Sequence, residues 1–473
     1  MRIVLATPPD TLGLEVTKVA GVVAPPLGLA YIASVLEQAG HRVYIVDSTC
    51  EGLGLDEFVK KVKSLKPDMV GMSLLTPTAP RAYRAARRLR EELPGVPLVA
   101  GGPHASMMPE EALAMGFDVV VRFEGEYTMR DLAWVVERDG LDPEALKGVE
   151  GIVYRGRGGE ARYTRRRPLI DCLDELPMPA YHLLPMDKYR VLGKPVRIAH
   201  VMASRGCPYG CMYCLTSHYW GRRLRFRSPE RVAEEVELLV DKYHVDHVAF
   251  ADDDLAINKL FVKRFVREVE ERGIDVSFSC GARVTDMTRE YMEFLYSHGF
   301  VALYFGVESA SQETLNRIGK KITVDQVRRV FRWAKELGGV AAGSFILGFP
   351  WETISDMEAT IRFAVELDPS YAQFTLLTPY PGTPLYTYAV RHNLIVDWDW
   401  EHYTTIRAVM RGFRFTARQA RQMLRKAYRV FYLRKDFILR ELRAGRLREL
   451  LPAVLRYAAS LLVDAIKTRV LRR

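Results

Sequence analysis

The stretch "SRGCPYGCMYCLT", residues 204–216, holds three of the chain's six cysteines, Cys207, Cys211 and Cys214. A proline and a glycine between them favour a looping backbone. Closely spaced soft thiolates bind zinc or an iron–sulfur cluster. A structural zinc site requires four ligands, usually in two C-x2-C pairs, whereas this stretch supplies three. The spacing C-x3-C-x2-C therefore favours a [4Fe–4S] cluster with one open iron over zinc or buried structural thiols.

The residues around this stretch repeat a pattern of strand followed by helix. Residues 196–395 hold six short apolar strand candidates, separated by segments of helical periodicity. Repeated βα units predict a partial (β/α)6 barrel, whose functional residues lie at the carboxyl ends of the strands. The cysteine stretch follows the first strand, so we expect it at that end of the barrel.

Residues 1–150 show a separate run of alternating strands and helices, beginning with the strand "RIVLAT". Short strands bounded by turn residues and separated by amphipathic helices predict an α/β domain with a doubly wound, Rossmann-like parallel sheet. Ligands of such sheets bind beyond the carboxyl ends of the strands. Neither a Walker-type lysine loop nor a GxGxxG sequence follows the first strand, so no nucleotide site is expected there.

Two further segments complete the predicted organisation. Residues 151–195 combine a hairpin pattern with a proline-containing connector and are interpreted as a linker. Residues 401–473 carry 19 Lys+Arg against 5 Asp+Glu, in a chain whose net charge is +10. We therefore expect residues 396–473 to form a basic C-terminal helical region, with apolar faces around Phe431 and Leu462.

Three roles are compatible with this basic region. Such helices pack on a neighbouring domain with their arginines in solvent, lie on an anionic membrane surface, or contact nucleic acid. Packing is favoured, the membrane surface comes second, and nucleic acid is the least expected.

Cysteine usage and hydropathy indicate the compartment. No signal peptide is visible, no run of 18 or more apolar residues occurs, and six scattered cysteines do not form a disulfide framework. We expect a cytoplasmic protein, with any membrane contact peripheral and at the inner face.

With Tyr213 directly before the last cysteine, the loop reads C-x3-C-x-Φ-C, and the chain resembles the radical S-adenosylmethionine (SAM) enzymes. The strand-end segments "FADDDLAIN", "FGVESASQETLNRIGK", "GSFILGFPWET" and "PYPGTPLY" resemble those of that family. Upstream, "PPLGLAYIASVLEQAGHRVYIVD", "GGPHASMMPEEAL" and "VVVRFEGE" resemble the cobalamin-binding domain joined to many such barrels. The resemblance covers about residues 1–395. The radical SAM enzymes with this cobalamin-binding domain include anaerobic porphyrin-ring cyclase and radical SAM methyltransferases.

The resemblance implies a chemistry and a set of SAM contacts. A cluster on the three cysteines would bind SAM at its open iron and cleave it to a 5′-deoxyadenosyl radical, which abstracts hydrogen from the substrate. The implied SAM contacts are Tyr213, Arg283, Glu308, Ser309, Phe345 and Gly348. From the residues alone, Glu308 is also a candidate helix N-cap, and Arg283 a candidate partner of a neighbouring acid.

Three adjacent carboxylates, Asp252, Asp253 and Asp254, follow the second barrel strand. They suggest a metal site, but successive side chains on a strand point to opposite faces. Hydrogen bonding beside the cluster, or capping of the next helix, is favoured instead. Cys280 is interpreted as a small buried residue.

The same resemblance implies cobalamin at the carboxyl edge of the first sheet. The implied contacts are Thr49, Ser73, Gly101, Gly102, Glu124 and Gly125. Many such domains carry D-x-H-x-x-G, whose histidine ligates cobalt from below, but here "DSTCEG" at residues 47–52 has Thr49 at that position. We expect no protein ligand there, with Cys50 as a less favoured alternative. His104 and Glu126 are candidates for either cofactor or ordinary loop contacts.

The expected reaction is methyl transfer to an unreactive carbon, with a lipid or isoprenoid as the first choice of substrate. Alternatives are cyclisation, oxidation or carbon–carbon bond formation, as in porphyrin-ring cyclisation and archaeal lipid ring formation. A protein that only senses cobalamin or SAM is an alternative of another class. The expected partners are a small-molecule or lipid substrate and an electron donor such as ferredoxin or flavodoxin, and nucleic acid is not expected.

Overall fold

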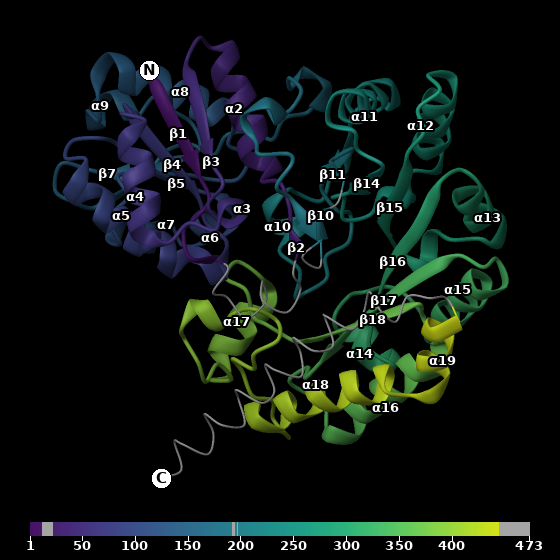
Figure 1. Cartoon of the computed structure of the whole chain (residues 1–473). Coiled ribbons are helices and arrows are strands. Elements are labelled where there is room, and N and C mark those ends of the chain that lie inside the picture. Colours follow the sequence, from purple (N-terminus) through teal and green to yellow (C-terminus); the bar gives the residue numbers. More distant parts are fainter. Residues whose placement is uncertain (12–21, 192–193, 196, 444–473) are drawn as a thin grey trace.

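The computed structural model describes residues 1–11, 22–191, 194–195 and 197–443. Two α/β units, each built on its own sheet, are followed by C-terminal helices (Figure 1). Both predicted sheets are present.

The first sheet has seven strands. The first five in spatial order are parallel, and each of the last two pairs antiparallel with the strand before it. The predicted hairpin of the linker forms these last two strands, so it extends the sheet. In spatial order the strands are β3 (Arg42–Val46), β1 (Arg2–Ala6), β4 (Met69–Ser73), β5 (Leu98–Gly101), β6 (Val119–Val121), β7 (Ile152–Arg155) and β8 (Ala161–Tyr163).

Helices cover both faces of this sheet, which confirms the doubly wound prediction. Side chains alternate along β1, so that Ile3 and Leu5 pack in one core cluster with α2 and α8, while Val4 and Ala6 pack in another with α4 and α5. The helices of this domain are α2 (Leu27–Gln38), α3 (Ser48–Glu51), α4 (Leu55–Ser64), η2 (Thr76–Thr78), α5 (Ala79–Glu92), α6 (Gly102–Met107), α7 (Pro109–Ala114), α8 (Glu126–Asp139) and α9 (Pro143–Leu146).

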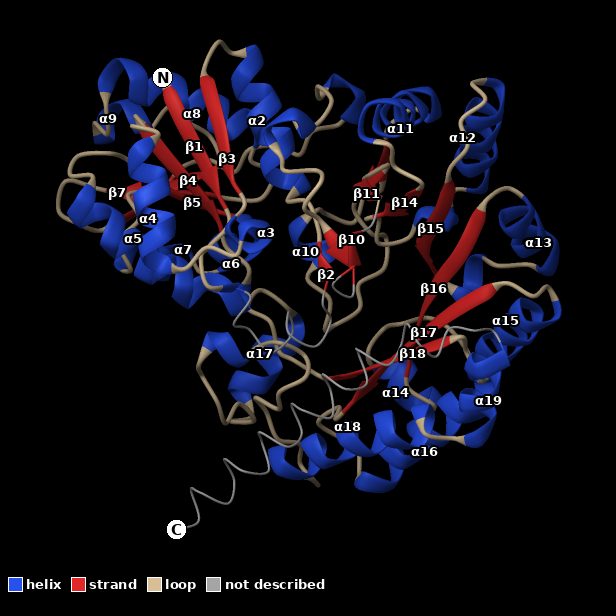
Figure 2. Ribbon diagram, in the orientation of Figure 1, coloured by secondary structure: helices blue, strands red, loops and turns tan. Residues whose placement is uncertain are grey.

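The second sheet has six parallel strands whose spatial order follows the chain, which is the arrangement of the predicted partial (β/α)6 barrel (Figure 2). Its first and last strands pair with one neighbour each, so the barrel is open. The strands are β11 (Ile198–Val201), β14 (His247–Phe250), β15 (Ser277–Ala282), β16 (Phe300–Glu308), β17 (Val340–Leu347) and β18 (Tyr371–Leu376).

Helices pack outside this sheet and are fixed by side-chain caps. Ser228, for example, caps α11 by accepting a hydrogen bond from the Arg231 backbone N–H. The helical segments are α11 (Pro229–Tyr243), η5 (Leu255–Ile257), α12 (Lys259–Glu271), η6 (Val284–Asp286), α13 (Arg289–Ser297), α14 (Gln312–Arg317), α15 (Val324–Glu336), α16 (Ile354–Leu367) and α17 (Pro384–Arg391).

Short elements connect the two units. One antiparallel ribbon pairs β12 (Ser204–Arg205) with β13 (Arg225–Phe226) and closes the cysteine loop at its base. A second small sheet pairs β9 (Arg190–Val191) with β10 (Lys194–Pro195) and β2 (Val22–Val23). The remaining short helices are η3 (Leu173–Glu175), η4 (Tyr181–Leu183), α10 (Thr216–Tyr219) and η7 (Trp400–His402).

The segment after the barrel returns to the first domain before it becomes helical. In η7, Trp400 donates its indole N–H to Glu111 at 2.9 Å, and Glu401 pairs with Arg81 at 3.0 Å and Arg84 at 2.9 Å. The N-terminal domain is thus contacted by a segment that follows the barrel in the chain.

The described part of the basic region packs on the barrel. The apolar face of α18 (Ala417–Tyr432) contacts α16 and β18, and Tyr432 donates its hydroxyl to the Ala372 carbonyl at 2.8 Å. α19 (Lys435–Arg443) follows it. The predicted face around Leu462 lies outside the described residues. In the described part of the chain, no helix is long and apolar enough to cross a membrane.

Candidate functional site

The cysteine loop lies at the carboxyl end of the barrel, between β12 and β13. Gly206 has φ +102°, and a Cβ there would overlap the Arg223 carbonyl oxygen, so only glycine fits where the loop begins. Two hydrogen bonds involving Met212 hold the middle of the loop, since its N–H donates to Ile318 at 3.0 Å and its carbonyl accepts from Leu385 at 2.9 Å. The loop is thus held by the segments that follow β16 and β18.

The three cysteine thiols are held in this loop in a low-polarity setting. Cys211 is buried, while Cys207 and Cys214 are half-buried. Burial raises the pKa of the Cys207 thiol to about 11, and it also raises the pKa of Cys214. Thiolates therefore require a compensating positive centre, which iron supplies. Within the described residues, no three Cys, His, Asp or Glu side chains are grouped to hold a single metal ion.

This donor set fits an iron–sulfur cluster better than zinc. One loop provides three soft ligands, and closed structural zinc requires four. In the described ranges the other three cysteines lie elsewhere: Cys280 is buried in β15, Cys172 is exposed in the linker, and Cys50 is half-buried in α3 of the first domain.

Two of the predicted SAM contacts meet beside this loop. The Tyr213 hydroxyl donates to Glu308 Oε1 at 2.9 Å, and Lys320 Nζ lies 2.6 Å from the same oxygen. Glu308 ends β16 with φ +67°, a strained conformation for a side chain of this kind. Backbone strain of this kind clusters at functional sites. Glu308 does not cap the following helix, because Ser311 does so.

Arg283 joins the same end of the barrel. Its guanidinium donates to the Lys320 carbonyl and stacks 3.4 Å from the Tyr209 ring centroid, inside the cysteine loop. It therefore connects the end of β15 and the segment after α14 to the loop.

Two other predicted SAM contacts, Ser309 and Gly348, are joined by the carboxyl group of Glu352, which the sequence analysis does not single out. Glu352 accepts the backbone N–H groups of Gly348 and Phe349 at 3.2 and 3.1 Å, and the Ser309 hydroxyl at 3.3 Å. Burial raises the pKa of Glu352 to about 7. The hydroxyl of Ser309 thus points to Glu352, and the Phe345 ring packs on Phe374 with their centroids 5.3 Å apart. At Phe345 and Gly348, the backbone at the end of the strand is therefore the surface that a ligand can contact.

The three adjacent aspartates take separate positions, as favoured from the sequence. Asp252 accepts the Ala203 backbone N–H at 3.0 Å, and burial raises its pKa to about 6. Asp253 accepts the Thr216 hydroxyl at 2.8 Å. Asp254 is buried next to Asp286, and burial together with this neighbouring carboxylate raises the pKa of Asp254.

A cavity of about 170 Å³ opens at the carboxyl ends of the first sheet. Its walls come from β1, β4, β5 and β6 and from α2 and α8, which is where such sheets bind ligands. Predicted cobalamin contacts that line it are Ser73, Gly101, Gly102 and Gly125. Tyr219 and Trp220 complete the wall from the barrel side.

The other two predicted cobalamin contacts lie outside this cavity. Thr49 Oγ1 is 2.6 Å from Thr11 Oγ1. Glu124 is buried in ion pairs with Arg205 at 3.2 Å and Arg225 at 2.9 Å. Neither side chain lines the space that the four other residues surround.

Two further candidates also have structural partners. Burial and the nearby Asp47 raise the pKa of Cys50 to about 12, and this thiol does not line the cavity. His104 is buried with Nδ1 3.2 Å from the Thr76 hydroxyl. It is a loop contact, whereas Glu126 does line the cavity.

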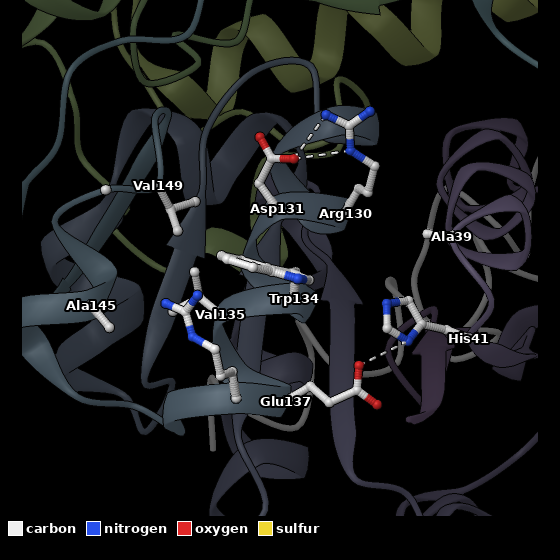
Figure 3. A pocket seen from close by; sticks show the side chains of 11 residues that line it. Ala39, His41, Arg130, Asp131, Trp134, Val135, Glu137, Ala145 and Val149 are labelled. Carbon is white, nitrogen blue, oxygen red and sulfur yellow. Dashed lines mark hydrogen bonds and ion pairs between the residues drawn. The ribbon is translucent and has the colours of Figure 1, made fainter.

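A larger hollow of about 560 Å³ lies elsewhere on the first domain (Figure 3). Trp134 of α8, His41 directly before β3 and Val149 between α9 and β7 line it. Its charged groups pair with one another, as Arg130 does with Asp131 at 2.9 Å. None of the predicted cobalamin contacts lines this hollow.

Comparison with known proteins decides the family. The B12-binding domain model matches residues 14–133, and the Radical SAM superfamily model matches residues 201–364. An uncharacterized methyltransferase of Pyrococcus horikoshii is 40% identical over 93% of this chain and 95% of its own. The chain belongs to the cobalamin-binding radical SAM enzymes.

Other members of this family catalyse different reactions. The anaerobic magnesium-protoporphyrin IX monomethyl ester cyclase of Rubrivivax gelatinosus is 29% identical over 88% of this chain and 75% of its own. The hopanoid C-3 methylase of Methylococcus capsulatus is 28% identical over 76% of this chain and 67% of its own.

A solved structure confirms the fold of this radical SAM enzyme. The methyltransferase TsrM from Kitasatospora setae, with cobalamin and a [4Fe–4S] cluster bound, superimposes with a TM-score of 0.66 at 18% identity. The match covers 90% of this chain and 81% of that one. The two matching family models make cobalamin, the cluster and SAM the cofactors of this radical SAM enzyme.

Three side chains at the barrel end were not predicted from the sequence: Lys320, Glu352 and Asp286. Glu352 had a detectable signal, because an acid follows the strand-end glycine in "LGFPWET". Lys320 and Asp286 had none, since each is brought to the barrel end beside a partner from another segment, Glu308 and Asp254 respectively.

Proposed function

We propose that this enzyme transfers a methyl group from SAM to an unreactive carbon of a lipid or isoprenoid substrate. One observation carries the methyl-transfer part: the cysteine loop runs directly into the cobalamin-domain cavity. Cys214 is followed by α10, and Tyr219 and Trp220 at its end line the cavity. Two cofactor regions joined by so short a segment suit a group that passes between them.

The residues at the barrel end have the chemistry to orient SAM. Cys207, Cys211 and Cys214 would hold the cluster, and Glu308, Lys320 and Arg283 present both charge signs beside it. SAM carries both an ammonium and a carboxylate, so such a site binds it in one orientation. When bound, the reduced cluster supplies the electron that cleaves SAM, and cobalamin carries the methyl group.

The cavity would accept only part of cobalamin. At about 170 Å³ it is smaller than the pockets that enclose a whole drug-sized ligand, roughly 300 Å³ and above. Ser73, Gly101, Gly102 and Gly125 present backbone and small side chains to it, so a bulky arm of the cofactor can approach closely.

The lipid substrate is supported by one relative and by charge. A relative is named hopanoid C-3 methylase, and hopanoids are isoprenoid lipids. Residues 444–473 hold seven Lys+Arg against two Asp+Glu, which would attract an anionic membrane surface. We propose peripheral contact at the inner membrane face of a cytoplasmic enzyme, with ferredoxin or flavodoxin as electron donor.

Cyclisation is the second candidate, because a relative that aligns with 88% of this chain is named a cyclase. Anaerobic turnover with lipid extract and SAM carrying a labelled methyl group separates the two. Methyl transfer puts label into a lipid product, whereas cyclisation gives an unlabelled product that has lost hydrogen. Label in a water-soluble product instead would overturn the lipid assignment and keep methyl transfer.

A further inference from the structure

The cobalamin-domain cavity is completed by the barrel domain. Trp220 and Tyr219 form part of its wall, and the Tyr219 hydroxyl donates to the Phe123 carbonyl at 2.8 Å. The wall therefore exists only when the two domains are docked, and the segment that supplies it lies between β12 and β13.

A buried ion-pair network holds this docked arrangement. Arg205 of β12 lies 2.6 Å from Glu126 Oε1 and 3.2 Å from Glu124 Oε1, and Arg225 of β13 lies 2.9 Å from Glu124. None of these four side chains is more than 4% exposed. Two positive and two negative groups balance, so the network is neutral and can be buried.

Glu126 is the one member of this network that also lines the cavity. Its Oε1 binds Arg205, whereas its Oε2 is buried and has no hydrogen-bond partner among the described residues. A buried carboxylate oxygen without a donor is costly, and such atoms in native proteins usually meet a ligand or water. The free oxygen thus calls for a donor in the cavity.

Cobalamin offers donors of the required kind, because primary amide groups surround its corrin ring. A neutral amide N–H satisfies the carboxylate without disturbing the charge balance of the network. A cation would leave the network with a net positive charge in a buried setting, which is unfavourable.

We propose that Glu126 joins cobalamin to the domain interface: Oε2 accepts an amide N–H of the cofactor while Oε1 keeps its ion pair with Arg205. Cobalamin binding then strengthens the docking of β12 and β13 on the first domain. By reciprocity, docking strengthens cobalamin binding. Glu126 is a positioning residue in this scheme, and the inference rests on the assignment of this cavity to cobalamin.

Hydroxocobalamin binding and hydrogen–deuterium exchange of the full-length protein test the proposal. In the unmodified protein, saturating hydroxocobalamin should slow amide exchange in residues 204–226 at least about threefold, since docking is strengthened. This measurement needs no variant, so it stands even if a substitution prevents folding.

Glu126→Gln and Glu124→Gln form a matched pair for the same experiment. Each removes one negative charge from the network, but Glu126→Gln alone removes an acceptor from the cavity. Its Kd for hydroxocobalamin should rise about tenfold, and the cofactor should no longer slow exchange in residues 204–226. Glu124→Gln weakens docking but keeps the acceptor in the cavity, so its Kd should rise less than that of Glu126→Gln, and the bound cofactor should still slow exchange in residues 204–226.

Unchanged exchange in residues 204–226 on cobalamin binding would overturn the inference. So would a Glu126→Gln variant that binds normally, or a Glu124→Gln variant that loses as much affinity. The underlying assignment is tested separately by Gly101→Val, which fills the cavity. Normal cobalamin binding by Gly101→Val overturns the assignment of the cavity. If Gly101→Val loses cobalamin binding but Glu126→Gln binds normally, only the inference about Glu126 is overturned.

Discussion

The two cofactor regions of this enzyme differ in the polarity and charge of the residues that line them. The cavity of the first domain is lined by glycines, apolar side chains and a single carboxylate, Glu126. The carboxyl end of the barrel carries three thiols with Lys320, Arg283 and several buried acids, among them Glu308. One region offers shape, and the other offers charge.

The difference follows from what each region has to bind. Cobalamin presents amides and a large rigid ring, so close approach and a few hydrogen bonds suffice. SAM and an iron–sulfur cluster are charged, and buried charges require partners. We therefore expect the cavity to be sensitive to added volume and the barrel end to be sensitive to altered charge.

The largest effect is expected at the cysteine loop. Cys207→Ala, Cys211→Ala and Cys214→Ala should each abolish the brown absorbance and 5′-deoxyadenosine formation, because two thiolates cannot hold the cluster. Iron content and product analysis measure this. Cys280→Ala, which alters a buried cysteine of β15, is the control and should keep its iron. A full iron complement in any of the three loop variants would contradict the assignment.

A change of volume should break the other region alone. Gly101 has φ −146°, which any residue adopts, and an added Cβ would come no closer than 3.8 Å to another atom. Gly101→Val should fold but fill the cavity and weaken cobalamin binding at least about 100-fold, with the cluster intact.

The control for this variant is Gly148→Val, which adds the same volume to the hollow of Figure 3. It should bind cobalamin normally, as measured by absorbance after gel filtration. Equal losses in the two variants would show a general folding defect rather than a blocked cavity.

A change of charge should affect SAM binding at the barrel end. Glu308→Gln leaves Lys320 without its carboxylate, so we expect unfolding to become easier by about 3 kcal/mol and SAM affinity to fall about tenfold. Removing both charges, with Glu308→Gln and Lys320→Met, should restore stability but not SAM binding. Restored SAM binding in the double variant would show that the pair is only structural.

Glu352 should give a smaller, pH-dependent effect. Its pKa is raised from 4.5 to about 7 in the folded protein, so the folded state holds the proton more tightly than the unfolded state. The unfolding free energy should therefore fall by about 1–3 kcal/mol as pH rises from below 4.5 through 7.

Glu352→Gln mimics the protonated carboxyl group and should lose this part of the pH dependence. Denaturant unfolding at several pH values measures it. Glu366→Gln, which alters an exposed glutamate of α16, the helix that follows Glu352, is the control and should follow the unmodified protein. Parallel pH profiles for Glu352→Gln and the unmodified protein would contradict the raised pKa.

The smallest effect is expected at the C-terminus. A chain ending at Arg443 keeps α18 and α19 on the barrel but loses seven Lys+Arg and two Asp+Glu. Its binding to anionic vesicles should weaken about tenfold at low salt, with turnover of a soluble substrate unchanged. Equal vesicle binding by the two chains would remove the support for membrane contact.

The sequence predicted well wherever one local pattern decides the outcome. Alternation along strands and the periodicity of helices predicted both sheets, and the family resemblance of the strand-end segments implied four residues that line the cavity. The cysteine spacing predicted the loop, and the family comparison confirmed its cofactor.

Prediction failed where a role depends on contacts distant in sequence. Glu124 was expected beside cobalamin, but it pairs with Arg205 and Arg225, about 80 and 100 positions away. The two glutamates of "FEGE" therefore have different roles, since Glu124 lies in the network and Glu126 also faces the cavity. No local pattern separates them.

The return of η7 to the first domain has a consequence for how the chain tolerates cleavage. Trp400 hydrogen-bonds Glu111, and Glu401 pairs with Arg81 and Arg84. The N-terminal domain is therefore held by a segment that follows the barrel. A protease cut in the exposed β7–β8 turn would therefore leave two fragments that remain associated. Such a nicked enzyme should elute as one particle, and its halves, produced as separate polypeptides, are natural candidates for reassembly.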